Sequence, residues 1–145
     1  MRRMLMEKLN RFLVENHPDL VVSLQADGRV TQYLQDRLDM LDDLPEVLLE
    51  KGQPLYIAED MCMEILTRDL QASKYHFICS QLSNFFETIY EDWSVSGILV
   101  FEVINLIQLC DPVFLEFGFC EESGDDPKIS AAAVEVIGKY VKKGL

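Results

Sequence analysis

The chain has 145 residues, of which 49% are hydrophobic and 26% are charged. This balance argues against intrinsic disorder, and the length suits one packed domain rather than two. Thirteen basic residues against 25 acidic residues give a formal charge of -12. A surface of that sign repels nucleic-acid phosphates and anionic lipid headgroups, so direct binding to either is disfavoured.

Apolar residues recur at helical spacing through the first part of the chain. Their period predicts a helix over residues 5–16, which should end before Pro18 because proline disfavours the helical conformation in its predecessor. A second helix is predicted over residues 30–42, with a short continuation over residues 45–49. Residues 20–24 are β-tolerant and have no clean period, so a strand is hardest to exclude there.

The middle of the chain carries two longer helical patterns. Apolar positions repeat at three and four over residues 54–70, and a second pattern extends over residues 73–89. Within the second pattern, Phe85 and Phe86 are expected to anchor the core. A break between helices is predicted at residues 92–94.

A strongly apolar helix is predicted next, from about residue 96 to residue 109. It is interrupted by Glu102, Asn105 and Gln108, which are spaced by three and therefore fall on one narrow strip. We expect this strip to face solvent or the edge of a groove, because burying an ionised carboxylate without a cation is costly. The remaining side chains are expected to face protein, and so apolar a helix also suggests self-association as a homodimer.

The last part of the chain predicts a short helical turn over residues 113–117, a loop over residues 121–126 and a final helix over residues 127–144. No stretch alternates strictly enough to require a sheet. The sequence therefore predicts an all-α fold, organised as a single compact bundle-like domain over residues 1–145. It should have five or six main helices with short helical appendages.

No motif in the sequence specifies a reaction. His76 and Cys79 are three residues apart on a predicted helix, a spacing at which an imidazole can activate a thiolate, but no orienting group or oxyanion donor is indicated. Cys62 would have to join them to bind zinc, and the close ligand pairs typical of structural zinc sites are absent. We therefore expect no catalytic residue, no metal ligand and no cofactor.

The start of the chain and the cysteines bear on its location. Charged residues after Met6 interrupt any apolar signal-peptide core. The four cysteines have no Cys-x-x-Cys spacing, which favours reduced thiols. No apolar stretch reaches the roughly 20 residues that span a bilayer. These features favour a cytoplasmic protein with no membrane association.

Negative charge is concentrated in one interval, because residues 75–127 contain ten acidic residues and no Lys or Arg. One interpretation is a solvated face that keeps the protein soluble. The functional hypothesis is a non-enzymatic accessory or regulatory protein that binds a partner protein, in particular a basic one, through an acidic helical surface. The candidate partner-binding residues are Glu87, Glu91, Asp92, Glu121, Glu122, Asp125 and Asp126.

Two alternative functions stay open. One alternative is a DNA mimic that inhibits a nucleic-acid-binding enzyme, although the charge of this chain is far more dilute than the one charge per about 1.7 Å of duplex DNA. A cysteine-dependent enzyme that uses Cys79 and His76 is the less favoured alternative.

Two stretches, residues 9–20 and residues 66–75, resemble an uncharacterised family of small helical proteins from Bacteroidetes. The first stretch contains Phe-Leu followed by His-Pro-Asp-Leu, and the second contains the Ser-Lys-Tyr junction, preceded here by Ala72 rather than phenylalanine. Members of that family look like passengers of conjugative transposons. The resemblance implies a helical, cytoplasmic accessory protein and brings no activity or catalytic residue.

Overall fold

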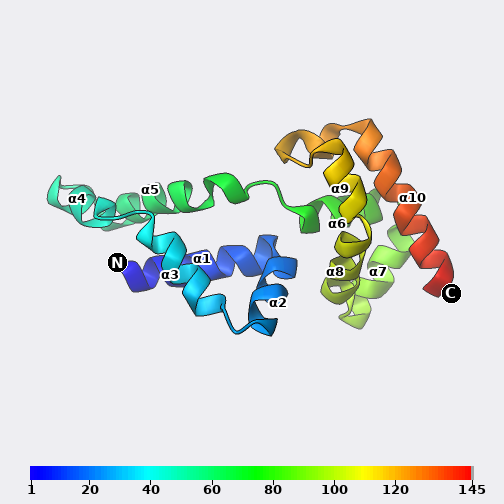
Figure 1. Cartoon of the computed structure of the whole chain (residues 1–145), viewed down its shortest axis with the longest axis horizontal. Coiled ribbons are helices and arrows are strands. Elements are labelled where there is room, and N and C mark those ends of the chain that lie inside the picture. The colour runs from blue at the N-terminus through cyan, green and yellow to red at the C-terminus, as the bar shows by residue number, and fades with distance from the viewer. Residues whose placement is uncertain (145) are drawn as a thin grey trace. The chain divides into compact units, whose positions relative to one another are not determined.

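A computed structural model describes residues 1–144 of the chain, except for the side chain of Glu121, and every regular element in this range is a helix (Figure 1). The all-α prediction is therefore confirmed. In chain order the elements are α1 (Arg2–Asn16), α2 (Pro18–Ala26), α3 (Val30–Asp39), α4 (Leu44–Glu50), α5 (Leu55–Thr67), the 3₁₀ helix η1 (Arg68–Leu70), α6 (Lys74–Phe85), α7 (Glu87–Ser96), α8 (Leu99–Leu109), α9 (Asp111–Phe117), the 3₁₀ helix η2 (Glu121–Asp125) and α10 (Pro127–Gly144).

The chain divides into two compact units, and each has a hydrophobic core of its own. Unit 1 comprises residues 1–71 and unit 2 begins at Ala72. Two cores are compatible with one cooperative domain or with two. The sequence-based expectation of a single domain over residues 1–145 therefore stays a prediction.

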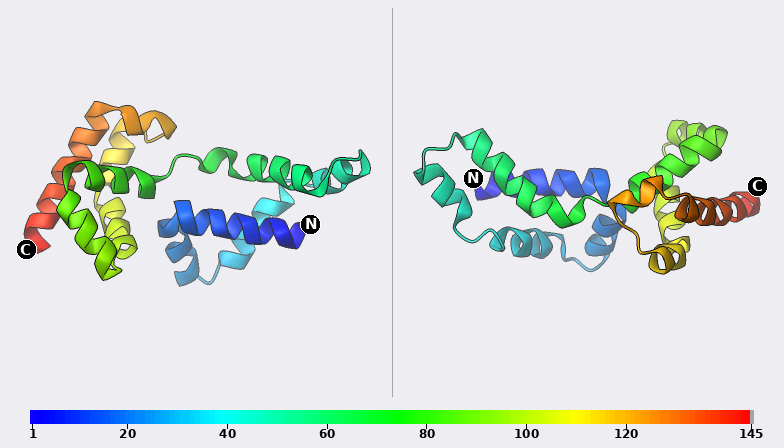
Figure 2. Two further views of the ribbon diagram at one scale, coloured as in Figure 1. Left: turned by 180° about the vertical axis from the view of Figure 1, so that it is seen from behind. Right: turned by 90° about the horizontal axis from the view of Figure 1, so that it is seen from above.

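Unit 1 is built around α1. Leu5, Leu9 and Leu13 lie on one stripe of this helix and are at most 1% exposed, and α2, α3 and α5 pack around it. Leucines at a spacing of four present one continuous apolar face, so burying that face holds the surrounding helices together. Figures 1 and 2 show α5 running alongside α1.

Two polar contacts fix the direction of α5 against α1. The ammonium of Lys8 donates to Oε2 of Glu59 over 2.7 Å, and the ring of His17 lies 2.7 Å from the carbonyl oxygen of Leu70. Lys8 and His17 follow one another along α1, and their partners follow in the same order along α5 and η1. The helices α1 and α5 are therefore parallel. The Glu59 side chain is only 5% exposed, so Lys8 neutralises a carboxylate that is almost removed from water.

The segment after Pro18 is helical, so residues 20–24, where a strand was hardest to exclude, belong to α2. Pro18 occupies the first turn of α2, where its missing N–H costs nothing. Val21 and Leu24 are both buried, and their spacing of three is helical rather than extended. His17, at φ -136° and ψ 55°, separates α2 from α1, as the proline predicted.

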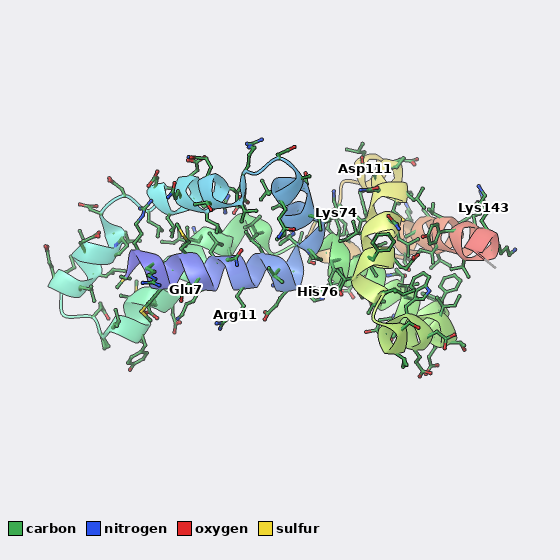
Figure 3. All side chains as sticks on the ribbon, turned by 90° about the horizontal axis from the view of Figure 1, so that it is seen from below. Glu7, Arg11, Lys74, His76, Asp111 and Lys143 are labelled. Atoms are coloured by element: carbon green, nitrogen blue, oxygen red, sulfur yellow. The ribbon has the colours of Figure 1, made fainter. Side chains whose placement is uncertain are left out.

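Unit 2 is built around α6, α8 and α10. Ile78, Leu82, Val103, Leu106 and Ile137 are completely buried among these helices. The ammonium of Lys74, at the start of α6, lies 3.9 Å from a carboxylate oxygen of Asp111, at the start of α9 (Figure 3). The start of α6 therefore lies beside the end of α8, and these two helices pack against each other.

The predicted break at residues 92–94 is wrong, because these residues lie inside α7. The chain leaves the helical conformation earlier, at Phe86, whose φ of -138° and ψ of 49° separate α6 from α7. Phe86 packs against the core of unit 2, so the break turns its ring inward. Ser94 lies inside α7, where its hydroxyl donates to the carbonyl oxygen of Tyr90 over 2.8 Å, and Gly97 ends α7 in the left-handed conformation.

Two smaller expectations also need correction. Phe85 is 59% exposed and is not a core anchor, whereas its neighbour Phe86 is half-buried against the core. The loop predicted over residues 121–126 contains the 3₁₀ helix η2. Ser123 explains this turn, since its buried hydroxyl accepts a hydrogen bond of 2.9 Å from the backbone N–H of Cys120.

Replacing Lys8 by Met should destabilise the protein, because it leaves the buried carboxylate of Glu59 without its cation. We expect the free energy of unfolding to fall by about 1 to 3 kcal/mol in denaturant titrations. The control is Arg3→Met on the same helix, whose ion pair with Glu7 is exposed and should be worth less than about 0.5 kcal/mol. Equal losses in the two variants would contradict the structural role of Lys8.

Residues 1–71 should fold without the rest of the chain, because their leucine core is made entirely from within unit 1. Domains of about 55–65 residues are known to fold alone. We expect the fragment to give a helical circular dichroism spectrum and a cooperative denaturant transition. A fragment that is unfolded in water, beside an intact chain that unfolds in one step, would instead support a single domain over residues 1–145.

Candidate functional site

The acidic residues of α7 form the first part of the candidate site. Glu87, Glu91 and Asp92 are all exposed. Glu87 and Glu91 are four residues apart, so their side chains lie one turn apart on the same side of the helix. No ion pair neutralises these three carboxylates within the described residues. They give α7 an unscreened negative face.

The second predicted acidic group lies elsewhere in unit 2. Glu122 and Asp125 are exposed on η2, while Asp126 precedes α10 and accepts a hydrogen bond of 2.9 Å from the backbone N–H of Lys128. The side chain of Glu121 lies outside the described part of the structure. Figures 1 and 2 show η2 at the start of α10 and α7 toward the other end of the unit. The structure therefore does not bring the two acidic groups together on one face.

A groove of about 540 Å³ lies beside the acidic face of α7. Ile89, Trp93, Ile98 and Val141 supply its apolar lining, and two carboxylates, those of Asp92 and Glu102, border it. Its remaining lining residues are Tyr140 and Lys143, both from α10. Figure 3 shows Lys143 at the C-terminal end of that helix. The groove thus combines apolar side chains with negative charge, and α7, α8 and α10 all contribute to it.

One hydrogen bond fixes the wall of this groove. The hydroxyl of Tyr140 donates to Oε2 of Glu102 over 2.5 Å, which joins α10 to α8. The carboxylate of Glu102 raises the pKa of Tyr140, because it accepts a hydrogen bond from the neutral phenol, and partial burial raises this pKa further. A hydrogen bond between Asn105 and the same hydroxyl acts in the opposite direction. Glu102 and Asn105 are both half-buried here.

The strip on α8 therefore lies where the sequence predicted. Glu102 borders the groove, and Gln108 is exposed to solvent. The expectation that the rest of this helix faces protein is wrong in part, because Phe101 is 66% exposed and Val100 is 47% exposed. These apolar side chains keep self-association open as a prediction.

His76 and Cys79 do not form an activated pair in the sense that a nucleophile requires. Burial raises the pKa of the Cys79 thiol, and a hydrogen bond with Tyr75 lowers it by less. A catalytic thiolate needs the opposite shift. His76 is exposed, its backbone N–H donates to the hydroxyl of Ser73, and its ring packs edge-on against Tyr75 at 5.4 Å.

The described residues contain neither a cluster of metal ligands nor a helix that could span a membrane. Between residues 1 and 144, no cluster of three or more His, Cys, Asp or Glu side chains is placed to hold a metal ion. None of the helices described in this range is long and apolar enough to cross a membrane. All four cysteines are free thiols.

The fold and the groove define a small all-α protein whose most distinctive surface is an acidic, partly apolar groove. Residues 5–142 match the model of the family described as Domain of unknown function (DUF1896), and the chain belongs to this family. The match covers nearly the whole chain and confirms that it is a member of an uncharacterised family. No curated protein matches the chain, and no solved structure does.

Sequence reasoning found the charges of the site and missed its apolar lining. The sequence pattern placed Trp93 in a break between helices and Ile98 on a core helix, so neither residue was expected to line a groove. One signal was available for the first of these: Ile89 and Trp93 are four residues apart and belong to one helical stripe. No sequence pattern shows that α10 returns to meet that stripe.

Unit 2 should lose stability at alkaline pH. Burial raises the pKa of Cys110 from its ordinary value of 9.0 to about 11, and that of Tyr75 from 10.0 to about 12. Burial favours the neutral, protonated form of both groups in the folded state. The stability that they contribute is therefore complete below pH 9 and is lost as pH rises toward 12. Denaturant titrations of the intact chain across this range measure the loss.

The variant Tyr75→Phe provides the matched control for this pH dependence. It removes one titrating phenol and keeps the ring, so its stability should fall less steeply between pH 10 and pH 12 than that of the natural chain. Superimposable pH profiles for the two proteins would show that Tyr75 ionises in the folded state as readily as in the unfolded chain.

Proposed function

We propose that this protein is a non-enzymatic accessory or regulatory protein that binds a basic, amphipathic helix of a partner protein in the groove of unit 2. The observation that carries the proposal is the combination of an apolar groove with a negative border formed by Asp92 and Glu102. Glu87 and Glu91 extend that negative charge along the exposed side of α7. An amphipathic helix with cationic flanks is the complement of such a surface.

The two components of the groove have different roles in binding. Apolar side chains of the partner, once buried against Ile89, Trp93 and Ile98, supply most of the affinity. The surrounding carboxylates steer a cationic segment toward the groove and disfavour an anionic one. Residues 75–127 contribute no Lys or Arg to this surface, and Lys143 of α10 is the one cation that lines the groove within the described residues. Binding should therefore become weaker as salt concentration rises.

Several broader properties are part of the same proposal. Four free thiols suit a reducing compartment, which supports a cytoplasmic location. The resemblance of residues 9–20 and 66–75 to proteins of Bacteroidetes supports an association with mobile elements. Exposed apolar residues of α8, such as Phe101, support formation of a homodimer. The DNA-mimic and cysteine-enzyme hypotheses stay alternatives without a specific observation in their favour.

A synthetic amphipathic helix of lysine and leucine tests the proposal directly. The single tryptophan of the chain, Trp93, lines the groove and reports occupancy through its fluorescence. We expect saturable binding, a shift of the emission to shorter wavelength as the ring leaves water, and weaker binding as salt is added. The triple variant Glu87→Gln, Glu91→Gln, Asp92→Asn should weaken binding about tenfold or more at low salt.

A charge-matched control separates the groove from the overall charge. The variant Glu116→Gln, Glu122→Gln, Asp125→Asn also removes three negative charges, but none of these residues lies on α7 or in the groove lining. It should change the affinity by less than about threefold. Equal weakening in the two triple variants would mean that the peptide responds only to net charge, and would overturn the proposed site.

A second pair of variants tests the apolar lining. Ile98→Asp introduces a charge into the groove, whereas Val95→Asp changes a side chain that is 90% exposed and lies outside the lining. We expect Ile98→Asp to abolish the fluorescence shift at peptide concentrations that saturate Val95→Asp. Circular dichroism of both proteins verifies that they stay folded. Unchanged binding by folded Ile98→Asp would contradict insertion of apolar side chains.

A further inference from the structure

Unit 1 contains a second pocket, which is independent of the groove and of the function proposed for it. The pocket measures about 240 Å³ and is formed by residues of α3, of the turn that follows α3, of α5 and of η1. Its apolar lining comes from Met40, Leu41, Ile65 and Leu66. Met40 is 73% exposed and Ile65 is 41% exposed, so the pocket opens to solvent. Methionine in such a position adapts easily to the shape of an apolar ligand.

The polar side of the pocket carries Arg37, Arg68 and Asp69. Arg37 and Asp69 form a bidentate ion pair, in which both terminal nitrogens of the guanidinium donate to the carboxylate. Arg37 also donates to the carbonyl oxygen of Leu66, and its side chain is only 14% exposed. The guanidinium of Arg37 lowers the pKa of Asp69, so the pair stays ionised. These two charges therefore cancel and close one side of the pocket.

Arg68 carries the one charge of the pocket lining that the Arg37–Asp69 pair does not neutralise. It is exposed, and it makes no ion pair within residues 1–144. The pocket therefore has a net charge of +1 in a protein whose formal charge is -12. A guanidinium offers parallel N–H donors that match the two oxygens of a carboxylate. An apolar pocket beside one uncompensated guanidinium is the complement of a small amphiphilic anion.

We propose that this pocket binds a small aliphatic carboxylate, with its hydrocarbon tail against Met40 and Ile65 and its carboxylate on Arg68. The volume limits the tail: a dry cavity of about 150 Å³ accommodates benzene, so a pocket of this size suits roughly six to ten carbon atoms. A monoanion matches the single free positive charge. The net acidity of the chain disfavours ligands with several negative charges at this site.

Octanoate is the probe, and the intact chain is titrated with it below its micellar concentration. Nuclear magnetic resonance with isotopically labelled methionine methyl groups should show saturable shifts at Met40, and calorimetry should give one site per chain. Octanol, which has the same tail and no charge, should bind at least tenfold more weakly. Absence of saturable octanoate binding, or equal affinity for octanol, would overturn the proposal.

Paired arginine variants test the assigned contact. Arg68→Gln should weaken octanoate binding at least tenfold and leave octanol binding within twofold. Arg11→Gln is the control, because Arg11 is exposed on α1 and does not line the pocket (Figure 3). Equal affinities of the two variants for octanoate would show that Arg68 does not hold the carboxylate and would contradict the proposal.

Blocking the pocket gives an independent readout. Ile65→Trp places a large ring at a half-open position of the lining, where it should displace the tail of the ligand. Octanoate binding should be lost while the circular dichroism spectrum stays helical, and Lys–Leu peptide binding to unit 2 should be unchanged. Retention of octanoate binding by the folded Ile65→Trp protein would place the ligand elsewhere and overturn the proposal.

Discussion

The helices of this chain are short, and this constraint governs the rest of the structure. They have between 7 and 18 residues, and isolated helices below about 12–15 residues are marginal in water. Most of these helices are therefore stable only where they bury an apolar face against others. In unit 1 that face is the leucine stripe of α1, and in unit 2 its counterpart on α10 is formed by Ile129, Ala133 and Ile137, all completely buried. Two cores follow from two such central faces.

Apolar stripes hold helices together but define their register only loosely, and three polar contacts supply the rest. Lys8–Glu59 joins α1 to α5, Arg37–Asp69 joins α3 to η1, and Tyr140–Glu102 joins α10 to α8. Each connects residues far apart in sequence, and each satisfies a charge that is partly or wholly removed from water. Such contacts add less stability than apolar burial. Removing one partner is nevertheless costly, because it leaves the other partner buried without a hydrogen bond or counter-charge. Two of the three border a pocket, so they also shape the candidate binding surfaces.

The sequence was sufficient for the helical class and for most buried faces, because a period of three and four is a local property. It was not sufficient at residues 85–94. Phe85 and Phe86 are equally apolar, and tertiary packing decides which of them turns inward. The ring of Phe86 lies next to Gly138 of α10, where the glycine has no side chain. The acidic residues were visible in the sequence for the same local reason. Their separation into two groups was not, since it depends on how α10 returns across unit 2.

The break at Phe86 also forms the groove on which the proposed function rests. Had α6 continued in one direction through Ile89, as its periodicity indicated, Ile89 and Trp93 would have extended the same face as Ile78 and Leu82. Instead α7 takes a direction of its own (Figure 1), and these side chains line an open groove with α8 and α10. The break therefore makes Ile89, which periodicity assigned to the core, part of a surface. Charge alone gives this surface only a sign, while the exposed apolar lining is what the proposed binding of an amphipathic helix requires.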